Sequence, residues 1–238
     1  MAEDLLLLHG FSGTHRAWDG VIARLDPQRY RPLALDLPGH GALADPAGPI
    51  TFEGCLESVL ARAPERFALA GYSLGGRIAL QVALTAPERV SRLILISCSP
   101  GIEDEAERAE RRAADHLLAE DLERIPFEDF IERWRTQPLF AADPLEVGRL
   151  AREDQRRNHP QALAAVMRGI GTGEMEPLWS RLGELQMTVK VVVGGRDSKF
   201  LALGQRMVDL MSRSELAVVE GGHGLLLESP AAIVQSID

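Results

Sequence analysis

The sequence predicts an α/β domain in which a mostly parallel β-sheet is flanked by helices and interrupted by a helical insertion. Three observations support this prediction. Short apolar runs alternate with helical patterns, one strand-to-helix turn contains closely spaced glycines, and the alternation stops between residues 101 and 183. With 238 residues, 45% of them hydrophobic, the chain can bury a sizeable core in one domain with a small insertion.

Six short apolar runs, most of them ending at glycine, proline or polar residues, predict buried parallel strands. Helical patterns follow the third and the fifth run, at residues 76–86 and 201–211. Strand and helix alternation of this kind places helices on both faces of a parallel sheet, and ligands then bind beyond the carboxyl ends of the strands. The six runs are residues 5–8, 32–36, 67–71, 93–96, 190–193 and 216–219.

Residues 101–183 are rich in Arg, Glu, Ala and Leu, show helical periodicity and contain few β-branched residues. We expect about four helices here, forming a lid over the sheet. The chain is therefore divided into an α/β core, residues 1–100 and 184–238, and a helical lid, residues 101–183. The charge run from Glu103 to Arg112 is typical of a solvated helix face.

The formal net charge of −9 argues against a nucleic-acid partner, and any anionic substrate would need a local cluster of arginines. Two cysteines, Cys55 and Cys98, are too few for a disulfide framework or a metal-ligand set, and their apolar neighbours predict buried thiols in a reducing cytoplasm. No secretory signal, membrane span, metal-ligand spacing or phosphate-binding loop is found. We expect a cytoplasmic protein that needs no metal or cofactor; its oligomeric state stays open.

The segment Gly71-Tyr72-Ser73-Leu74-Gly75 matches the pattern G-x-S-x-G between a predicted strand and a predicted helix. A serine on such a tight turn has strained backbone angles, and bulky neighbours would collide. The pattern predicts that Ser73 is a nucleophile or base exposed above the sheet. The alternative is a glycine-rich turn without chemistry.

A serine hydroxyl needs a neighbouring base to take its proton. His223 follows Gly221-Gly222 after the last predicted strand, and Asp197 follows the fifth. The order Ser, Asp, His is typical of enzymes with this serine motif, and Asp197 would fix the imidazole tautomer. The alternative for Asp197 is a cap on the next helix.

An oxyanion hole needs two backbone N–H groups aimed at one point. The residue after the serine, Leu74, supplies one of them in this motif. We assign the other to Phe11, in the loop His9-Gly10-Phe11-Ser12-Gly13 that follows the first strand.

Several motifs together resemble the α/β-hydrolase superfamily, and within it the 2-succinyl-6-hydroxy-2,4-cyclohexadiene-1-carboxylate synthases of menaquinone biosynthesis. The superfamily motifs are His9-Gly10-Phe11, residues 36–41 (DLPGHG), residues 71–77 (GYSLGGR) and Gly222-His223. The more specific ones are residues 97–101 (SCSPG), 107–112 (ERAERR), Trp134 with 137–140 (QPLF), 171–173 (GTG), 177–179 (PLW) and 197–200 (DSKF).

The resemblance implies a lyase that removes a ring proton from a substrate bearing several carboxylates and eliminates pyruvate. Ser73, activated by His223 and Asp197, would be the base, and the oxyanion hole would hold an enolate-like charge. Arginine binds carboxylates through a planar fork. The residues expected to contact substrate are Arg77, Arg111, Arg156, Tyr72 and Trp134.

The sequence departs from the family pattern at two positions, where Arg135 replaces a tyrosine and Leu226 a second histidine. Two leading strands common in the superfamily are not expected, and the end at Asp238 is short for a final helix.

Two other functions stay open. The same Ser-His-Asp set could hydrolyse an ester, lactone or thioester through an acyl-serine, or the chain could be a binding protein without activity.

Overall fold

The computed structural model describes residues 2–45, 48–141 and 143–238. In these residues a six-stranded, wholly parallel sheet has the strand order β2-β1-β3-β4-β5-β6. Every predicted run falls within or largely within one strand, so the α/β prediction is confirmed. The strands are β1 (Glu3–Leu8), β2 (Tyr30–Leu35), β3 (Phe67–Tyr72), β4 (Val90–Ile96), β5 (Thr188–Gly194) and β6 (Ser214–Val219).

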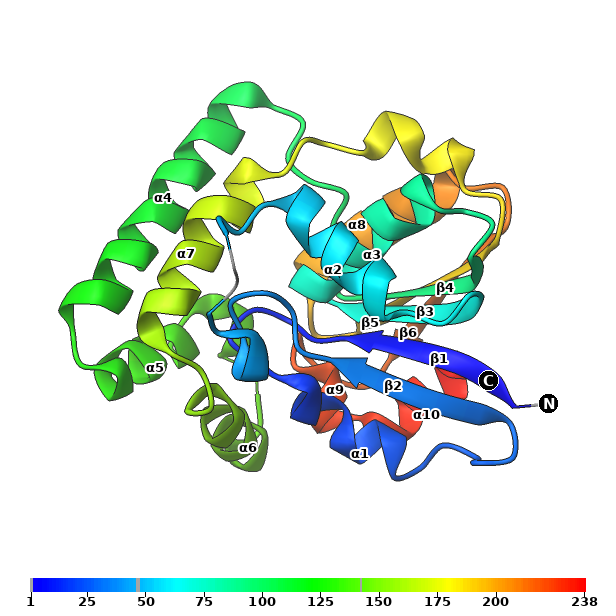
Figure 1. The fold of residues 1–238 in the computed structure, drawn as a ribbon, viewed down its shortest axis with the longest axis horizontal. Helices are drawn as coiled ribbons and strands as arrows, with labels where there is room; N and C mark the ends of the chain where they lie inside the picture. Colours follow the sequence, from blue (N-terminus) through cyan, green and yellow to red (C-terminus); the bar gives the residue numbers. More distant parts are fainter. Residues whose placement is uncertain (1, 46–47, 142) are drawn as a thin grey trace.

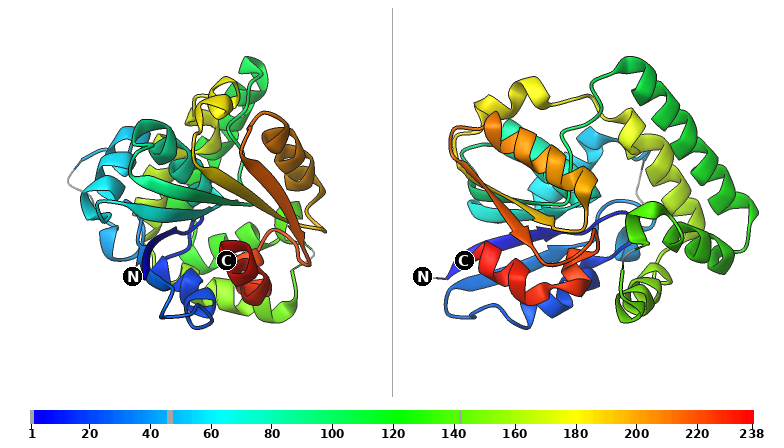
Figure 2. Two further views of the ribbon diagram at one scale, coloured as in Figure 1. Left: turned by 90° about the vertical axis from the view of Figure 1, so that its right-hand side faces the viewer. Right: turned by 180° about the vertical axis from the view of Figure 1, so that it is seen from behind.

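The run of four leucines in β1 shows why the sheet forms at this place. Successive side chains of a strand point to opposite faces. Leu6 and Leu8 pack with the helices on one face, while Leu5 and Leu7 pack with those on the other. All four are fully buried. A strand that is apolar on both faces is stable only between two helical layers, and Figures 1 and 2 show such layers above and below the sheet.

The two helical layers complete the core. The final helix corrects the expectation that the chain is too short at its end: Pro230 begins α10, and Ile233 and Ile237 are buried against β1 and β3 residues. One face is covered by α2 (Phe52–Arg62), α3 (Leu74–Thr85) and α8 (Ser198–Asp209), and the other by α1 (Asp19–Ile22), α9 (Leu225–Glu228) and α10 (Pro230–Ile237).

Between β4 and β5 the chain forms a separate helical layer, on the left in Figure 1. Asp104 caps its first helix by accepting a hydrogen bond from the Glu107 amide at 2.8 Å. This layer has a small apolar core of its own, in which α4 packs along α7. Its helices are α4 (Glu105–Arg124), α5 (Phe127–Arg135), α6 (Leu145–Gln155) and α7 (Pro160–Ile170), with short 3₁₀ turns η3 (Pro138–Phe140), η4 (Thr172–Glu174) and η5 (Trp179–Glu184).

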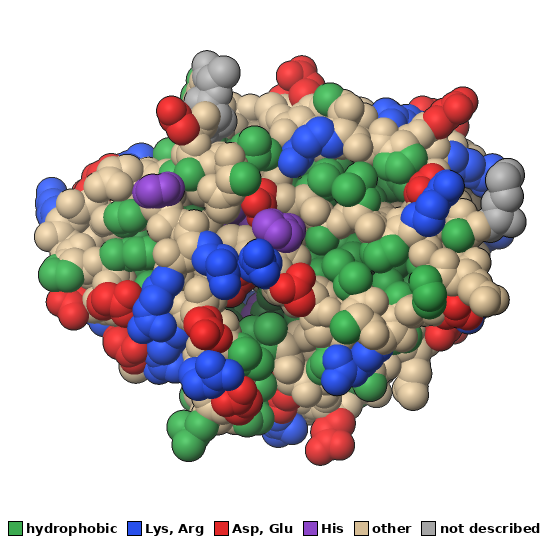
Figure 3. All heavy atoms as spheres, turned by 60° about the horizontal axis from the view of Figure 1, so that its bottom comes forward, with side chains coloured by type: hydrophobic (Ala, Val, Ile, Leu, Met, Phe, Trp, Pro, Cys, Tyr) green, Lys and Arg blue, Asp and Glu red, His purple; other side chains and the backbone are tan. Residues whose placement is uncertain are grey.

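Four α-helices thus occupy the segment for which about four were expected, and the boundaries at 101 and 183 stay a prediction. Within the described ranges, each helix is too short or too polar to cross a lipid bilayer. Acidic and basic side chains lie interleaved over the face shown in Figure 3, as expected for a chain with many surface ion pairs.

Candidate active site

The turn between β3 and α3 holds Ser73 in a backbone conformation that side chains rarely adopt, with φ at 51° and ψ at −109°. Such a conformation costs about 1–3 kcal/mol and persists where the surroundings over-determine it. A Cβ on Gly71 would lie 2.4 Å from the Gly75 carbonyl oxygen, and one on Gly75 would lie 2.4 Å from the carbonyl oxygen of Leu8. The glycines of the motif are therefore required by the close crossing of three backbone segments.

Ser73, His223 and Asp197 meet at the carboxyl ends of the strands. The Ser73 Oγ lies 3.2 Å from Nε2 of His223, and Nδ1 of His223 lies 2.8 Å from Oδ2 of Asp197. Because the carboxylate can only accept, Nδ1 carries the proton and donates it, which leaves Nε2 free to accept the serine hydroxyl. His223 and Asp197 are buried, while Ser73 is half-buried and faces a cavity.

Three aromatic rings surround the His223 imidazole. Phe200 and Tyr72 lie 4.6 Å and 5.5 Å from the His223 ring, measured between ring centroids, and Phe140 lies at 6.0 Å. The sequence motifs contain Phe140 and Phe200, but their packing on the imidazole was not predicted. Such packing holds the ring in one orientation and excludes water from it.

The backbone N–H groups of Phe11 and Leu74 have no acceptor within residues 2–45, 48–141 and 143–238. Both residues line the same cavity as Ser73. Gly10 must lack a side chain, because a Cβ there would come within 2.9 Å of the Tyr72 ring. Two free amides beside the serine are the arrangement that an oxyanion hole requires.

Two buried histidines brace the loop that carries Phe11. His9 Nδ1 donates to the Gly10 carbonyl at 2.8 Å, and its Nε2 accepts the Leu37 amide at 3.1 Å. His40 Nε2 accepts the Ser12 amide at 3.2 Å. The sequence analysis placed His9 and His40 in family motifs but gave them no structural role. The motifs that contain them, His9-Gly10-Phe11 and residues 36–41 (DLPGHG), were the available indication of one.

We expect the stability of the protein to fall with acidity through His40. Burial, and then the neighbouring His9, lower the pKa of His40 from 6.5 to about 3. The unfolded chain therefore binds a proton between pH 6.5 and about 3 that the folded chain refuses, and stability is lost as the pH falls through this window. Since Nε2 must accept the Ser12 amide, protonation would also break that contact.

The predicted difference is about 2 kcal/mol of unfolding free energy between pH 7 and pH 5 for this one group. Urea unfolding of His40→Gln should show a shallower pH dependence than the wild-type protein. His159→Gln, at an exposed helix cap, is the matched control and should keep the wild-type slope. Equal slopes for wild type and His40→Gln would show that His40 does not titrate as described.

A cavity of about 850 Å³ lies between the helical insertion and the carboxyl ends of the strands, and it contains the Ser73 site. Arg77 lines it and is 8% exposed. Its Nη1 donates to the Ile170 carbonyl at 3.0 Å, and its guanidinium forms no ion pair with any carboxylate in the described part of the chain. Burial, and then the charge of Arg111, lower the pKa of Arg77 to about 10, so it stays cationic at neutral pH.

Arg111 lines the same cavity but differs from Arg77 in its partners. Its Nε donates to Oδ1 of the fully buried Asp115 at 2.8 Å, while Oδ2 of Asp115 accepts the Gly173 amide at 3.0 Å. Arg111, whose side chain is 37% exposed, is thus held by Asp115 against the η4 turn at the cavity wall.

Tyr72 and Trp134 also line the cavity. The Trp134 ring lies 4.9 Å from the Phe11 ring between centroids, so it contacts the loop that carries the free amide.

Arg156 is not brought to the cavity, and the prediction for this residue is corrected. Its guanidinium donates to both carboxylate oxygens of Glu128 at 2.8 Å and is solvent-exposed. The reason is helical geometry: at the end of α6, Asp154 and Gln155 take the buried face, which turns Arg156 outward.

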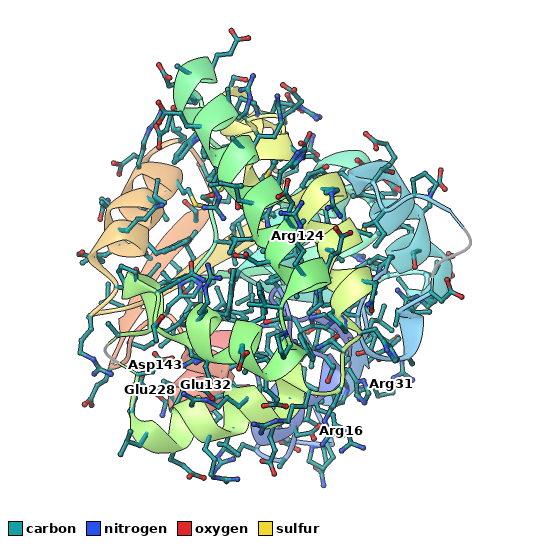
Figure 4. The ribbon with its side chains drawn as sticks, turned by 90° about the vertical axis from the view of Figure 1, so that its left-hand side faces the viewer. Arg16, Arg31, Arg124, Glu132, Asp143 and Glu228 are labelled. Carbon is teal, nitrogen blue, oxygen red and sulfur yellow. The ribbon has the colours of Figure 1, made fainter. Side chains whose placement is uncertain are left out.

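A buried ion pair that the sequence did not indicate joins Arg135 to Asp143 at the cavity wall. Arg135 also lies over the Phe140 ring, 4.3 Å from its centroid. Figure 4 shows Asp143 close to Glu228, and both approach Gly222: Glu228 accepts its amide at 2.7 Å. Arg135, noted in the sequence as a departure, thus pairs with another residue of the insertion, at the place where the insertion approaches the loop before His223.

Comparison with known proteins agrees with this geometry. A sequence profile described as the Alpha/beta hydrolase family matches residues 5–236. The chain belongs to the α/β-hydrolase family. No group of three or more His, Cys, Asp or Glu side chains in the described ranges of this α/β-hydrolase could hold a metal ion.

Relatives of this α/β-hydrolase carry a more specific name. A putative 2-succinyl-6-hydroxy-2,4-cyclohexadiene-1-carboxylate synthase of Bacillus subtilis is 33% identical over 96% of this chain and 86% of that protein. The synthase of that name from Salmonella agona is 32% identical over 99% and 92%. The structure of MenH from S. aureus superposes with a TM-score of 0.90 at 30% identity, covering 99% of this chain and 91% of that one. An enol-lactonase from Burkholderia xenovorans, at 18% identity and a TM-score of 0.82, shares the fold alone.

Proposed function

We propose that this protein is a 2-succinyl-6-hydroxy-2,4-cyclohexadiene-1-carboxylate synthase, a lyase that eliminates pyruvate from a succinyl-enolpyruvyl-hydroxycyclohexene-carboxylate. The observation that carries the proposal is Arg77: a buried cation that pairs with no carboxylate in residues 2–45, 48–141 and 143–238, in the cavity that also contains Ser73. A buried charge without a partner is costly, and a substrate carboxylate would remove that cost. The names of the relatives at 30–33% identity support the same activity.

The first step is proton abstraction. Ser73 passes its hydroxyl proton to Nε2 of His223, 3.2 Å away, and takes the ring proton next to the succinyl ketone. Asp197, 2.8 Å from Nδ1, stabilises the imidazolium that forms. The electron pair from the broken C–H bond moves to the ketone oxygen, where the Phe11 and Leu74 amides stabilise the enolate.

The second step is elimination. The enolate re-forms the ketone, a new ring double bond forms, and the bond between the ring and the enolpyruvyl oxygen breaks. The leaving enolate takes the proton held by the Ser73 and His223 pair and becomes pyruvate. Atoms and electrons balance without a metal, an oxidant or a cofactor, since each step is a proton transfer or an elimination.

The test supplies the cyclohexene substrate to the purified protein and follows pyruvate with lactate dehydrogenase through the loss of NADH absorbance. The proposal expects pyruvate and the cyclohexadiene product in equal amounts. Rapid hydrolysis of simple esters without pyruvate release from the substrate would instead assign an acyl-serine hydrolase. We place the enzyme in the cytoplasm, a proposal supported by the free, buried thiols of Cys55 and Cys98.

Replacing Arg77 with alanine is expected to weaken substrate capture. A charge-assisted hydrogen bond contributes about 1.5–3 kcal/mol, so KM should rise about 10- to 100-fold in the pyruvate assay. Arg77→Lys should recover only part of this loss, because lysine lacks the planar fork. Arg149→Ala removes an exposed arginine of α6 and should leave KM unchanged. An unchanged KM in Arg77→Ala would remove the main support for an anionic substrate.

A further inference from the structure

The carboxyl end of α6 lies against the loop that follows β1, and a set of hydrogen bonds joins them. Oδ2 of Asp154 accepts the Thr14 amide at 2.8 Å, and Oδ1 accepts the Thr14 hydroxyl at 2.5 Å. Gln155 Nε2 donates to the Ser12 hydroxyl at 2.9 Å, and Asn158 Nδ2 donates to the Ser12 carbonyl at 2.8 Å. The end of α6 and the residues just after it therefore hydrogen-bond to the loop on both sides of Gly13, at Ser12 and at Thr14.

Ser12, directly after Phe11, is held through its amide, its carbonyl and its hydroxyl. Its amide donates to His40, its carbonyl accepts from Asn158 and its hydroxyl accepts from Gln155. Its φ is 58°, a conformation that is strained for serine. Strain of this kind persists only where neighbouring contacts impose it, so the end of α6 helps to impose the loop conformation at Phe11.

We propose that Asp154, Gln155 and Asn158 are positioning residues that hold the Phe11 N–H group toward Ser73, so that docking of the lid helix α6 sets the strength of the oxyanion hole. This inference rests on the proposed role of the Phe11 amide. All three residues are buried, while the guanidinium of their neighbour Arg156 is exposed and donates to Glu128. The segment from residue 154 to residue 158 therefore contains both the proposed positioning residues and a control position, Arg156.

A substitution that breaks the contact between Thr14 and Asp154 should therefore lower kcat and leave substrate binding, measured as KM, nearly unchanged. Thr14 is buried and does not line the cavity, so changing it leaves the arginines untouched. A displaced oxyanion donor costs up to about 10²–10³ in rate, and smaller misplacements cost less. We expect Thr14→Val, which removes the hydroxyl but keeps the shape, to lower kcat about 10- to 100-fold while KM stays within about two-fold.

The experiment compares Thr14→Val, Thr14→Ser, Asp154→Asn and the control Arg156→Ala. Two rates are measured: pyruvate release, and phosphonylation of Ser73 by a fluorophosphonate probe, which needs the oxyanion hole but not the natural substrate. Thermal unfolding identifies any variant that fails to fold. Thr14→Val and Asp154→Asn should lose both rates, Thr14→Ser should recover most of the loss, and Arg156→Ala should match the wild type.

The proposal is overturned if the folded Thr14→Val and Asp154→Asn proteins react with the probe as fast as the wild type, or if Arg156→Ala loses as much as they do. It is also overturned if Thr14→Ser is as slow as Thr14→Val, since the hydroxyl would then not be the group that matters. If the wild-type protein reacts with the probe at Ser73 but releases no pyruvate, only the proposed function is contradicted. The probe rates of the variants would still test whether Asp154, Gln155 and Asn158 position the Phe11 amide.

Discussion

Replacing Ser73 with alanine is expected to lower kcat for pyruvate release by about 10⁴- to 10⁶-fold, the range seen when the serine of a Ser-His-Asp set is removed. The alanine takes away the group that lies 3.2 Å from His223 Nε2 and leaves the imidazole without a path to the substrate. The residual rate would come from binding and from the two oxyanion amides.

Ser73→Ala should still fold, because alanine keeps the Cβ and the backbone conformation of the turn, and in the described residues the lost hydroxyl bonds only to His223. Equal thermal unfolding midpoints for the variant and the wild type would exclude a folding defect. The matched control is Ser180→Ala, at an exposed position of η5. A loss of less than about ten-fold in Ser73→Ala would mean that another group is the base.

Replacing Asp197 with asparagine is expected to have the second largest effect, a loss of about 10⁴-fold in kcat. An amide facing Nδ1 of His223 favours the tautomer with its proton on Nε2, which cannot accept a proton from Ser73. The proposed contact between Arg77 and substrate does not involve Asp197, so KM should change little. The assay is again pyruvate release, with thermal unfolding as the test of folding.

The same variant separates the two interpretations of Asp197. The structure gives it both contacts: Oδ2 faces His223 at 2.8 Å, and Oδ1 accepts the Phe200 amide at 3.4 Å as the cap of α8. If capping were its whole role, Asp197→Asn would keep its activity, since asparagine is as good a cap. Asp209→Asn, at the exposed end of α8, is the control and should behave as the wild type.

The α/β prediction succeeded because the signals on which it depends are local. Leu5 to Leu8 is apolar at every position, so it requires helices on both sides whatever the rest of the chain does. The final helix was missed because Pro230 to Ile237 is short and is stabilised by burying Ile233 and Ile237 rather than by its own periodicity.

The insertion shows where local signals fail. On α4 and α6, charged residues are frequent on every face, so periodicity does not say which of them turn inward. Successive residues of a helix differ by about 100° in direction, and one position separates the buried Gln155 from the exposed Arg156. Arg135 and Asp143, which come from different elements, could be paired only once those elements were placed.

The sequence by itself determined the layered fold, the strained serine turn and the identity of the three residues predicted to form the proton relay, because glycine spacing, apolar runs and chain order are properties of neighbouring residues. Tertiary structure alone decided which arginines face the cavity, how His40 and the end of α6 brace the Phe11 loop, and where Arg135 finds its partner. These depend on distances between segments up to 146 residues apart, as between Ser12 and Asn158, and such distances exist only after the sheet and the insertion have packed together.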